Sequence, residues 1–171
     1  KDTCVMSIFT LTSPAFEDGG WFPIRNTGFG EDLSPELHIH GVSEKAKSIA
    51  VVFDDLDIPG LEEYNHWVMW NFPVPKGAVD VIIPEGIPAG ETVKELGGIM
   101  QGVGFGNHKY RGPRPPVLVR KKHEYRFTVY TLDCFLDLKA KAEKFDLTKA
   151  MENHVRQIGE LRGFFQRGHK E

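Results

Sequence analysis

The stretch 123–132, His-Glu-Tyr-Arg-Phe-Thr-Val-Tyr-Thr-Leu, is the clearest structural signal in the chain. In an extended backbone His123, Tyr125, Phe127 and Val129 fall on one face, and the residues between them fall on the other. The stretch is rich in aromatic and β-branched residues, which is typical of strands. We therefore predict a β-strand over 123–132 that carries an imidazole and a phenol on one face.

Shorter strand-like runs precede this one and are separated by turn-forming residues. The chain of 171 residues contains 18 glycines and 11 prolines, so turns are frequent. The run 48–53 is apolar throughout, which predicts a strand buried on both faces. Many short strands with such punctuation indicate an antiparallel β-sandwich or barrel. The other predicted strands cover 5–10, 36–40, 66–72 and 79–83.

The last quarter of the chain changes to a helical period. One set of residues recurs at spacings of four and three, which predicts a single helical face: Leu147, Met151, His154, Ile158 and Leu161. We expect this helix to be capped by Asp146 or Thr148 and to end before Gly163. A shorter helix is predicted over 139–144 and a final strand over 163–166. No repeat or linker divides the chain, so we expect one mainly β domain over 1–171 with a C-terminal helix packed against it.

Composition excludes several classes of protein. Acidic residues exceed basic ones by only three, 24 against 21, which argues against a strongly basic nucleic-acid-binding face. The apolar runs are far shorter than the roughly 20 residues of a membrane span. The N-terminus shows no signal-peptide pattern, and from the missing initial Met we expect a processed or clipped start. Two cysteines, Cys4 and Cys134, are too few for a disulfide scaffold, so we expect reduced thiols and a cytoplasmic protein.

Acidic residues follow the buried run 48–53, and a histidine opens the next predicted strand. Asp55 and Asp57 are two residues apart, so an extended chain would point both carboxylates the same way. Paired like charges raise the pKa of one member, which suits a proton donor. The alternative is an ordinary polar turn. His66 has the chemistry to bind an anion, ligate a metal or transfer a proton, or it is a strand-end histidine satisfied by the backbone.

The turn 110–116, Tyr-Arg-Gly-Pro-Arg-Pro-Pro, is unusually stiff. Three prolines within four residues fix the backbone and withhold amide donors, which predicts a rigid wall. The alternative is a polyproline surface loop. The glycine-rich stretch 102–106 lacks the residues that complete a phosphate-binding loop. His38 and His40 have the spacing of two metal ligands on one strand face, but no third ligand is evident nearby, which favours a surface strand.

These segments, in this order, resemble the phosphatidylethanolamine-binding protein family, also called Raf kinase inhibitor proteins, and are most similar to its bacterial and archaeal branch. The family's Asp-Pro-Asp-x-Pro signature is matched by 55–59, and its His-Trp strand opening by 66–67. Its Gly-Pro-x-Pro-Pro loop is matched by 112–116, and its His-x-Tyr-x-Phe strand by 123–127. Three residues depart from the pattern: Leu56 for a proline, Arg114 for a frequent cysteine and Val103 for a common asparagine.

The resemblance implies a large antiparallel sheet packed on a smaller one, and a small pocket for phosphate-like anions. The ligand-binding residues that it implies, with their motif neighbours, are Asp55, Asp57, Pro59, His66, Tyr110, Gly112, Arg114, Pro116, His123 and Tyr125. Family members inhibit kinases or proteases by occupying a partner's surface, and microbial relatives suggest a homodimer.

The expected function is therefore non-enzymatic binding of a phospholipid head group or a phosphorylated partner, with no cofactor, no resident metal, no nucleic acid and no transmembrane segment. The competing hypothesis is an enzyme. In it, Asp55, Asp57, His66 and His123 would act as acid–base groups or metal ligands of a hydrolase.

Overall fold

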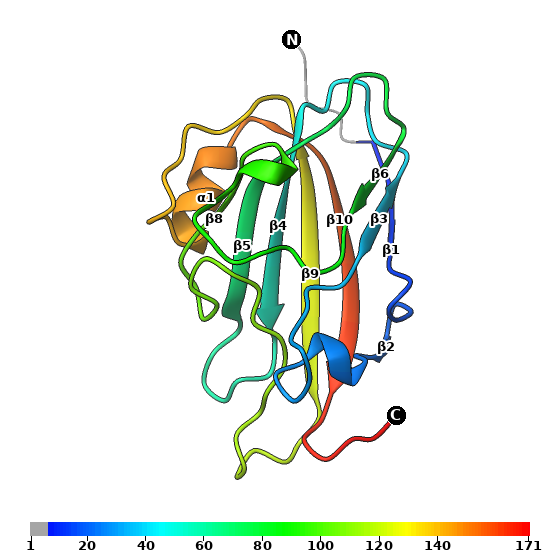
Figure 1. The fold of residues 1–171 in the computed structure, drawn as a ribbon, viewed down its shortest axis with the longest axis vertical. Helices are drawn as coiled ribbons and strands as arrows, with labels where there is room; N and C mark the ends of the chain where they lie inside the picture. The colour runs from blue at the N-terminus through cyan, green and yellow to red at the C-terminus, as the bar shows by residue number, and fades with distance from the viewer. Residues whose placement is uncertain (1–6) are drawn as a thin grey trace.

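The computed structural model describes residues 7–171, which form two β-sheets, one α-helix and two short 3-10 helices (Figure 1). The seven strands of the large sheet, in spatial order, are β2 (Gly20–Trp21), β10 (Val155–Phe165), β9 (His123–Leu132), β4 (Ser48–Asp55), β5 (Tyr64–Pro73), β8 (Ile99–Gln101) and β7 (Thr92–Val93). The small sheet has the order β1 (Thr10–Thr12), β3 (Leu37–His40) and β6 (Asp80–Ile83). The helices are η1 (Ile24–Asn26), η2 (Lys94–Leu96) and α1 (Lys144–Met151).

The strand pattern predicts the centre of the large sheet well. β9 covers 123–132 as predicted, and β4 continues two residues beyond the predicted run, to Asp55. Every pair of neighbouring strands is antiparallel except β2 and β10, which are parallel. The strand predicted over 5–10 lies partly outside the described residues. Of its described part only Thr10 belongs to a strand, β1, and residues 7–9 form none. A mainly β fold of a large and a small sheet is therefore confirmed.

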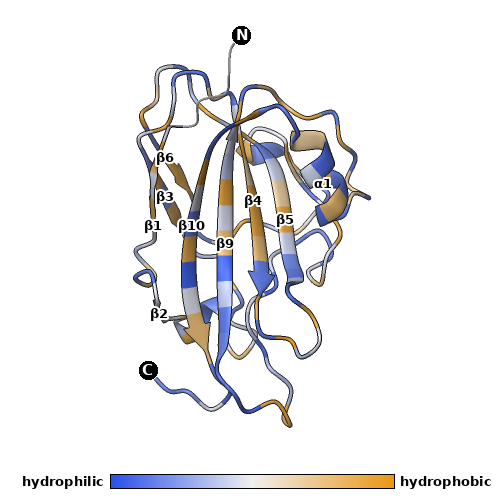
Figure 2. Cartoon of the chain, turned by 180° about the vertical axis from the view of Figure 1, so that it is seen from behind, coloured by the Kyte–Doolittle hydropathy of each residue, from blue (hydrophilic) through white to orange (hydrophobic). Residues whose placement is uncertain are grey.

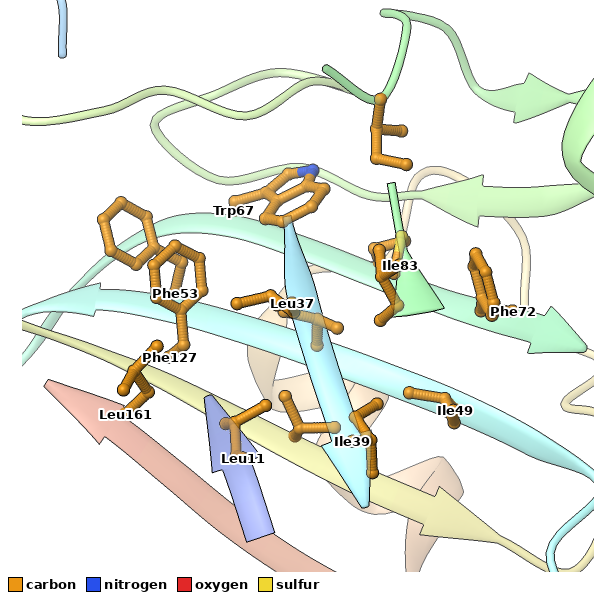
Figure 3. Close-up of a cluster of buried hydrophobic side chains, with 14 of the residues drawn as sticks. Leu11, Leu37, Ile39, Ile49, Phe53, Trp67, Phe72, Ile83, Phe127 and Leu161 are labelled. Carbon is orange, nitrogen blue, oxygen red and sulfur yellow. The ribbon is translucent and has the colours of Figure 1, made fainter. Parts of the chain in front are cut away.

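The core lies between the two sheets. Leu37 and Ile39 of β3 are fully buried and lie over β4 and β9, where they meet side chains such as Phe53 and Phe127 (Figure 3). The Phe53 and Phe127 rings stack with their centroids 4.2 Å apart. Burying large aromatic side chains contributes strongly to stability because each removes a large apolar area from water. Phe53 lies two residues before the end of β4 and pairs with Phe127 of β9, so the stacked pair is close to the end of the sheet at which β4 ends and β9 begins.

The other face of the large sheet is covered by the segment that contains α1. Apolar residues of β4, β5 and β9 pack there against Leu147 and Met151 of the helix. Figure 2 shows hydrophobic residues along β4 and β9, whereas the last residues of β4 are hydrophilic. β4 is therefore buried on both faces, as its uninterrupted apolar run predicted, and its polar end carries two carboxylates.

The helix predicted through Leu161 is wrong: α1 ends at Met151, and residues 155–165 form β10. Ile158, expected on the buried helical face, is 40% exposed. The chain reverses at Asn153, which has a positive φ of 70°. β10 fits the sheet because it lacks side chains where core rings approach: a Cβ on Gly159 would lie 2.3 Å from the Phe9 ring. The predicted final strand over 163–166 is the end of this longer strand.

The other helix predictions in this region also need correction. Glu143 caps α1 through a capping box with Asp146, so neither Asp146 nor Thr148 is the N-cap. The segment predicted as a shorter helix, 139–144, is a turn that leads into α1. Among the described residues, no helix is long and apolar enough to cross a membrane.

A Gly163→Ala substitution tests the strand assignment of β10. A Cβ at this position would lie 2.6 Å from the Phe22 ring, so we expect the substitution to destabilise the protein by about 1–3 kcal/mol through overpacking. The free energy of unfolding in urea measures this. Glu160→Ala, at an exposed position of the same strand, is the control and should change stability by no more than about 0.5 kcal/mol. Equal effects of the two substitutions would contradict the packing of β10 against Phe22.

Candidate functional site

A cavity of about 260 Å³ lies at the end of the large sheet where β4 ends and β5 and β9 begin. The end of β4 and the starts of β5 and β9 meet here because β4 pairs antiparallel with both neighbours, and the β4–β5 and β8–β9 loops complete the walls. Most of its walls are apolar, with a few polar groups among them, which is the usual make-up of a small-molecule site. The lining residues are Asp55, Ile58, Pro59, Tyr64, His66, Phe105, Arg114, Pro115, Pro116, Val119, His123 and Tyr125.

The central polar contact of the cavity joins Asp55 to His123. The Nδ1 atom of His123 lies 2.9 Å and 3.1 Å from the two carboxylate oxygens of Asp55, so Nδ1–H donates to Asp55. Both side chains are almost completely buried. The second ring nitrogen, Nε2, is buried as well and has no hydrogen-bond partner among the described residues. Buried polar atoms without partners are rare, and among the residues that line the cavity this nitrogen is one of them.

His66 presents a second imidazole to the cavity. Its Nδ1 lies 2.7 Å from the carbonyl oxygen of Arg111, and because a carbonyl only accepts, Nδ1 carries the proton. The ring packs edge-on against Phe105. Burial lowers the pKa of His66 below its ordinary value, although the bond to Arg111 and the charge of Asp55 oppose the shift. His66 is therefore a neutral imidazole near neutral pH.

Tyr125 adds a phenol that keeps its proton. Burial raises the pKa of Tyr125 far above the ordinary value for tyrosine, and the neighbouring Asp55 carboxylate raises it further. The ring is held against Phe53, with centroids 5.7 Å apart. Its position follows from the strand pairing, because Tyr125 lies directly opposite Asp55 across β4 and β9. The site thus combines a carboxylate, two imidazoles and a phenol on one face of the sheet.

The stiff loop 110–116 forms one wall, but its residues have different roles. Arg114, Pro115 and Pro116 line the cavity, whereas Tyr110 and Gly112 do not. The Tyr110 hydroxyl donates to the Asn26 carbonyl at 2.7 Å, and the Gly112 amide donates to Asp32 at 2.9 Å. Tyr110 and Gly112 therefore anchor the wall from behind.

Gly112 also cannot be replaced without moving the chain. A Cβ on it would lie 2.3 Å from the carbonyl oxygen of Asn26, so only glycine allows the two loops to approach this closely. Burial raises the pKa of Asp32, which is opposed by the hydrogen bond from Gly112. Sequence reasoning missed Asp32, because nothing in its local sequence marks a residue that anchors a loop 80 positions away.

Asp57 does not join Asp55 in the cavity. Its carboxylate accepts the backbone amide of Glu124 at 2.7 Å and lies 3.7 Å from the ammonium of Lys121. The prediction that Asp55 and Asp57 point the same way assumed an extended chain, but β4 ends at Asp55. The Asp57 amide instead bonds back to the Asp55 carboxylate at 2.8 Å. Asp57 therefore fixes the turn and Pro59 supplies the nearby wall.

Sequence reasoning also missed five of the residues that line the cavity: Ile58, Tyr64, Phe105, Pro115 and Val119. Ile58 and Pro115 lie inside motifs that were recognised, so adjacency was an available signal for them. Phe105 lies in the glycine-rich stretch 102–106, whose sequence gives no sign that this ring lines a cavity. Its ring supports the guanidinium of Arg111, 3.8 Å above the centroid.

The phosphatidylethanolamine-binding protein family model matches residues 12–166, which is most of the chain and includes every residue that lines the cavity. The chain belongs to the phosphatidylethanolamine-binding protein family. Its relatives include UPF0098 proteins of archaea. One from Pyrococcus abyssi is 41% identical over 156 residues, which cover 91% of this chain and 84% of the relative. Another, from Methanothermobacter thermautotrophicus, is 40% identical and covers 92% of this chain and 99% of the relative.

Solved structures of bacterial family members share the fold. A Chlamydia trachomatis chain described as a phosphatidylethanolamine-binding protein homologue is 27% identical, with a TM-score of 0.77 over 94% of this chain and 98% of that one. E. coli YbcL, 24% identical, superposes with a TM-score of 0.78 over 92% of this chain and 98% of its own. The resemblance to the bacterial and archaeal branch is therefore confirmed for the family and for the fold.

His66→Gln tests the electrostatics of the cavity. Because the folded-state pKa of His66 is lowered, only the unfolded chain takes up this proton as the pH falls through about 6.5. Wild-type stability therefore falls in that window through His66, and a glutamine removes this contribution. We expect the stability lost in His66→Gln to be smaller at about pH 5.5 than at about pH 7.5. Urea unfolding at both pH values measures it, and a pH-independent difference would contradict a neutral buried His66.

Proposed function

We propose that this family member is a non-enzymatic binding protein that takes a phosphate-like anion in the cavity between His66 and His123. The observation that carries the proposal is the Nε2 atom of His123, which is buried without a hydrogen-bond partner among residues 7–171. Arg114 lines the same cavity and has no carboxylate within 4.0 Å among the described residues. The unpartnered nitrogen, with the cationic residue Arg114 among the lining residues, favours a ligand with negative charge.

The Asp55 carboxylate supports anion binding although it carries the same charge as the ligand. A protonated His123 would donate from Nδ1 to Asp55 and from Nε2 to the bound anion, so the imidazolium lies between the two negative charges. The Tyr125 phenol keeps its proton and is a further donor. Charge-assisted hydrogen bonds of this kind are short and about twice as strong as neutral ones.

The apolar walls favour an anion that carries an organic group. Ile58, Phe105, Pro116 and Val119 would contact this group, while the polar end of the cavity holds the phosphate. A phospholipid head group and a phosphorylated peptide share this chemistry, and the family's name refers to a phosphatidylethanolamine ligand. Occupation of the cavity by a phosphorylated segment of a kinase or protease partner would make the protein a regulator of that partner.

The hydrolase alternative uses the same side chains in a different way. Asp55 is engaged with His123 and with the Asp57 amide, and Asp57 is engaged with the Glu124 amide. Neither carboxylate therefore acts directly on a cavity ligand: Asp55 bonds to His123, and Asp57 does not line the cavity. Among the described residues, the side chains that line the cavity do not bring three metal-ligating atoms together. This arrangement supports binding over turnover.

A calorimetric titration with inorganic phosphate tests the proposal. We expect saturable binding by the wild type, and affinity about 10- to 100-fold lower in His123→Gln and in Asp55→Ala, because each loses a charged hydrogen-bond partner of the site. Lys121→Gln is the matched control, since Lys121 is exposed, pairs with Asp57 and does not line the cavity. Equal affinity in wild type, Asp55→Ala and His123→Gln would refute the proposal.

Two further arms separate the ligand sources and the enzyme. Glycerophosphoethanolamine represents the head group, and a phosphoserine peptide represents a modified partner. The source that binds more tightly than inorganic phosphate is the one whose organic group uses the apolar walls. Turnover of a generic phosphoester by the wild type, lost in His66→Ala, would establish the hydrolase instead.

A further inference from the structure

A second cluster of chemically active side chains lies at the opposite end of β9 from the cavity. β9 ends at Leu132, Asp133 and Cys134 follow it directly, and His154 immediately precedes β10. The Asp133 amide donates to the His154 carbonyl at 3.0 Å, which keeps the two backbones together. Ten residues separate His123 from Asp133, so the cluster lies about 30 Å from the cavity at the rise of an extended strand.

The three side chains converge on one point. One ligand atom from each of Asp133, Cys134 and His154 lies within 4.8 Å of the others. The His154 Nδ1 atom is 2.9 Å from an Asp133 oxygen. All three residues are partly exposed, so an ion and a water molecule can reach them. The backbone of Cys134 is fixed as well, because its carbonyl accepts a hydrogen bond of 2.6 Å from Ser48.

We propose that Asp133, Cys134 and His154 form a binding site for Zn²⁺, with the fourth position of the tetrahedron left to water. A thiolate, an imidazole and a carboxylate are the three ligand types that zinc takes from proteins. Mg²⁺ and Ca²⁺ require mostly oxygen ligands, and the cluster offers a single carboxylate. Three protein ligands with one open position match the coordination of a zinc ion that remains accessible to solvent.

Arg156 fits this site as the group that orients the carboxylate. Its guanidinium pairs with Asp133 Oδ2, whereas His154 contacts Asp133 Oδ1. The aspartate can bind a metal through Oδ1 while Oδ2 stays on Arg156. The metal then replaces the hydrogen bond between His154 Nδ1 and Oδ1, and the Cys134 thiol releases its proton to water. Partners that hold a metal-binding carboxylate in place commonly tune affinity in this way. The positive charge of Arg156 also offsets part of the negative charge that the thiolate and carboxylate bring together.

The competing explanation is that the cluster only stabilises the connection between β9 and β10. In that case the His154–Asp133–Arg156 contacts are an ordinary network of ion pairs, to which the thiol of Cys134 adds only a hydrogen bond to Asp133. The two explanations differ in one measurable respect, because only a metal site needs the sulfur. Asp133 and Cys134 lie about twenty residues before His154, and this spacing matches no metal-binding motif. The sequence therefore does not predict the cluster, which only the fold brings together.

Titration of the metal-free protein with Co²⁺, a spectroscopic substitute for Zn²⁺, tests the proposal. We expect a near-ultraviolet thiolate-to-cobalt absorption band that saturates at one equivalent and disappears when Zn²⁺ is added. Cys134→Ser should abolish the band, and both Cys134→Ser and His154→Gln should weaken Zn²⁺ binding at least about 100-fold, beyond the cost of losing a group that only orients a ligand. Cys4→Ser is the matched control, since it removes the other cysteine, and it should keep the band.

Thermal unfolding provides the second readout. Zn²⁺ should raise the melting temperature of the wild type and of Cys4→Ser but not that of Cys134→Ser, because only a metal bound to the native state stabilises it. Absence of the cobalt band in the wild type would overturn the proposal. A band that survives in Cys134→Ser but is lost in Cys4→Ser would overturn it too. Phosphate binding in the same preparations reports on the distant cavity, so the two proposals can fail separately.

Discussion

The register between β4 and β9 is the constraint on which the rest of the site depends. Asp55 pairs with Tyr125 at the end of this ladder, which brings the carboxylate within hydrogen-bonding distance of His123, two residues away on the same face. A slip of one residue would move these side chains to the other face of the sheet. The long apolar run of β4 prevents such a slip, because it packs against the small sheet on one side and the α1 segment on the other.

The end of β4 serves both faces of the sheet. Asp54, next to Asp55, lies on the α1 side, where its carboxylate pairs with Arg126 of β9 at 3.1 Å and with Lys144 of α1 at 2.8 Å. Glu63 joins the same two cations, and its hydrogen bond with Lys144 lowers its pKa to about 2. A fully buried carboxylate without such partners would be costly. Asp54 therefore holds α1 against the sheet. The neighbouring Asp55 points to the opposite face, where it orients His123.

The sequence predicts the elements whose burial follows a simple period and fails where contacts are remote. The alternation of side chains between two faces predicted both ends of β9 correctly, and the apolar run 48–53 predicted β4 up to its last two residues. The helical spacing of apolar residues from Leu147 to Leu161 was misleading. It runs through α1 and β10, a helix and a strand, on either side of the turn at Asn153. The glycines at 159 and 163, which make room for rings from the N-terminal segment, were the signal that this stretch is a strand.

The site was predictable in part, for related reasons. Three of the lining residues lie near the starts of strands that the sequence predicts: His66, His123 and Tyr125. The family resemblance therefore sufficed to assign them to one pocket. Asp57, Tyr110 and Gly112 lie in the same motifs, yet they hold the walls from behind. Which side of a loop faces a cavity depends on the partner that anchors the loop, and the partner of Gly112 is a distant aspartate. A motif locates such residues near the site without assigning their orientation.

The net negative charge of the protein bears on how the cavity would hold the proposed anion. Acidic residues exceed basic ones by three, so the protein as a whole does not attract anions. If the cavity binds an anion as proposed, attraction has to come from groups at short range, whose electrostatic interactions are strongest where water is excluded. Under the proposed function, the His123 imidazole and the Tyr125 phenol are the donors that meet that requirement, and Arg114 is the cationic residue of the wall. In that case the loop 110–116 contributes a wall whose prolines add no amide donors, so that selectivity for the proposed ligand would rest with a few fixed side chains.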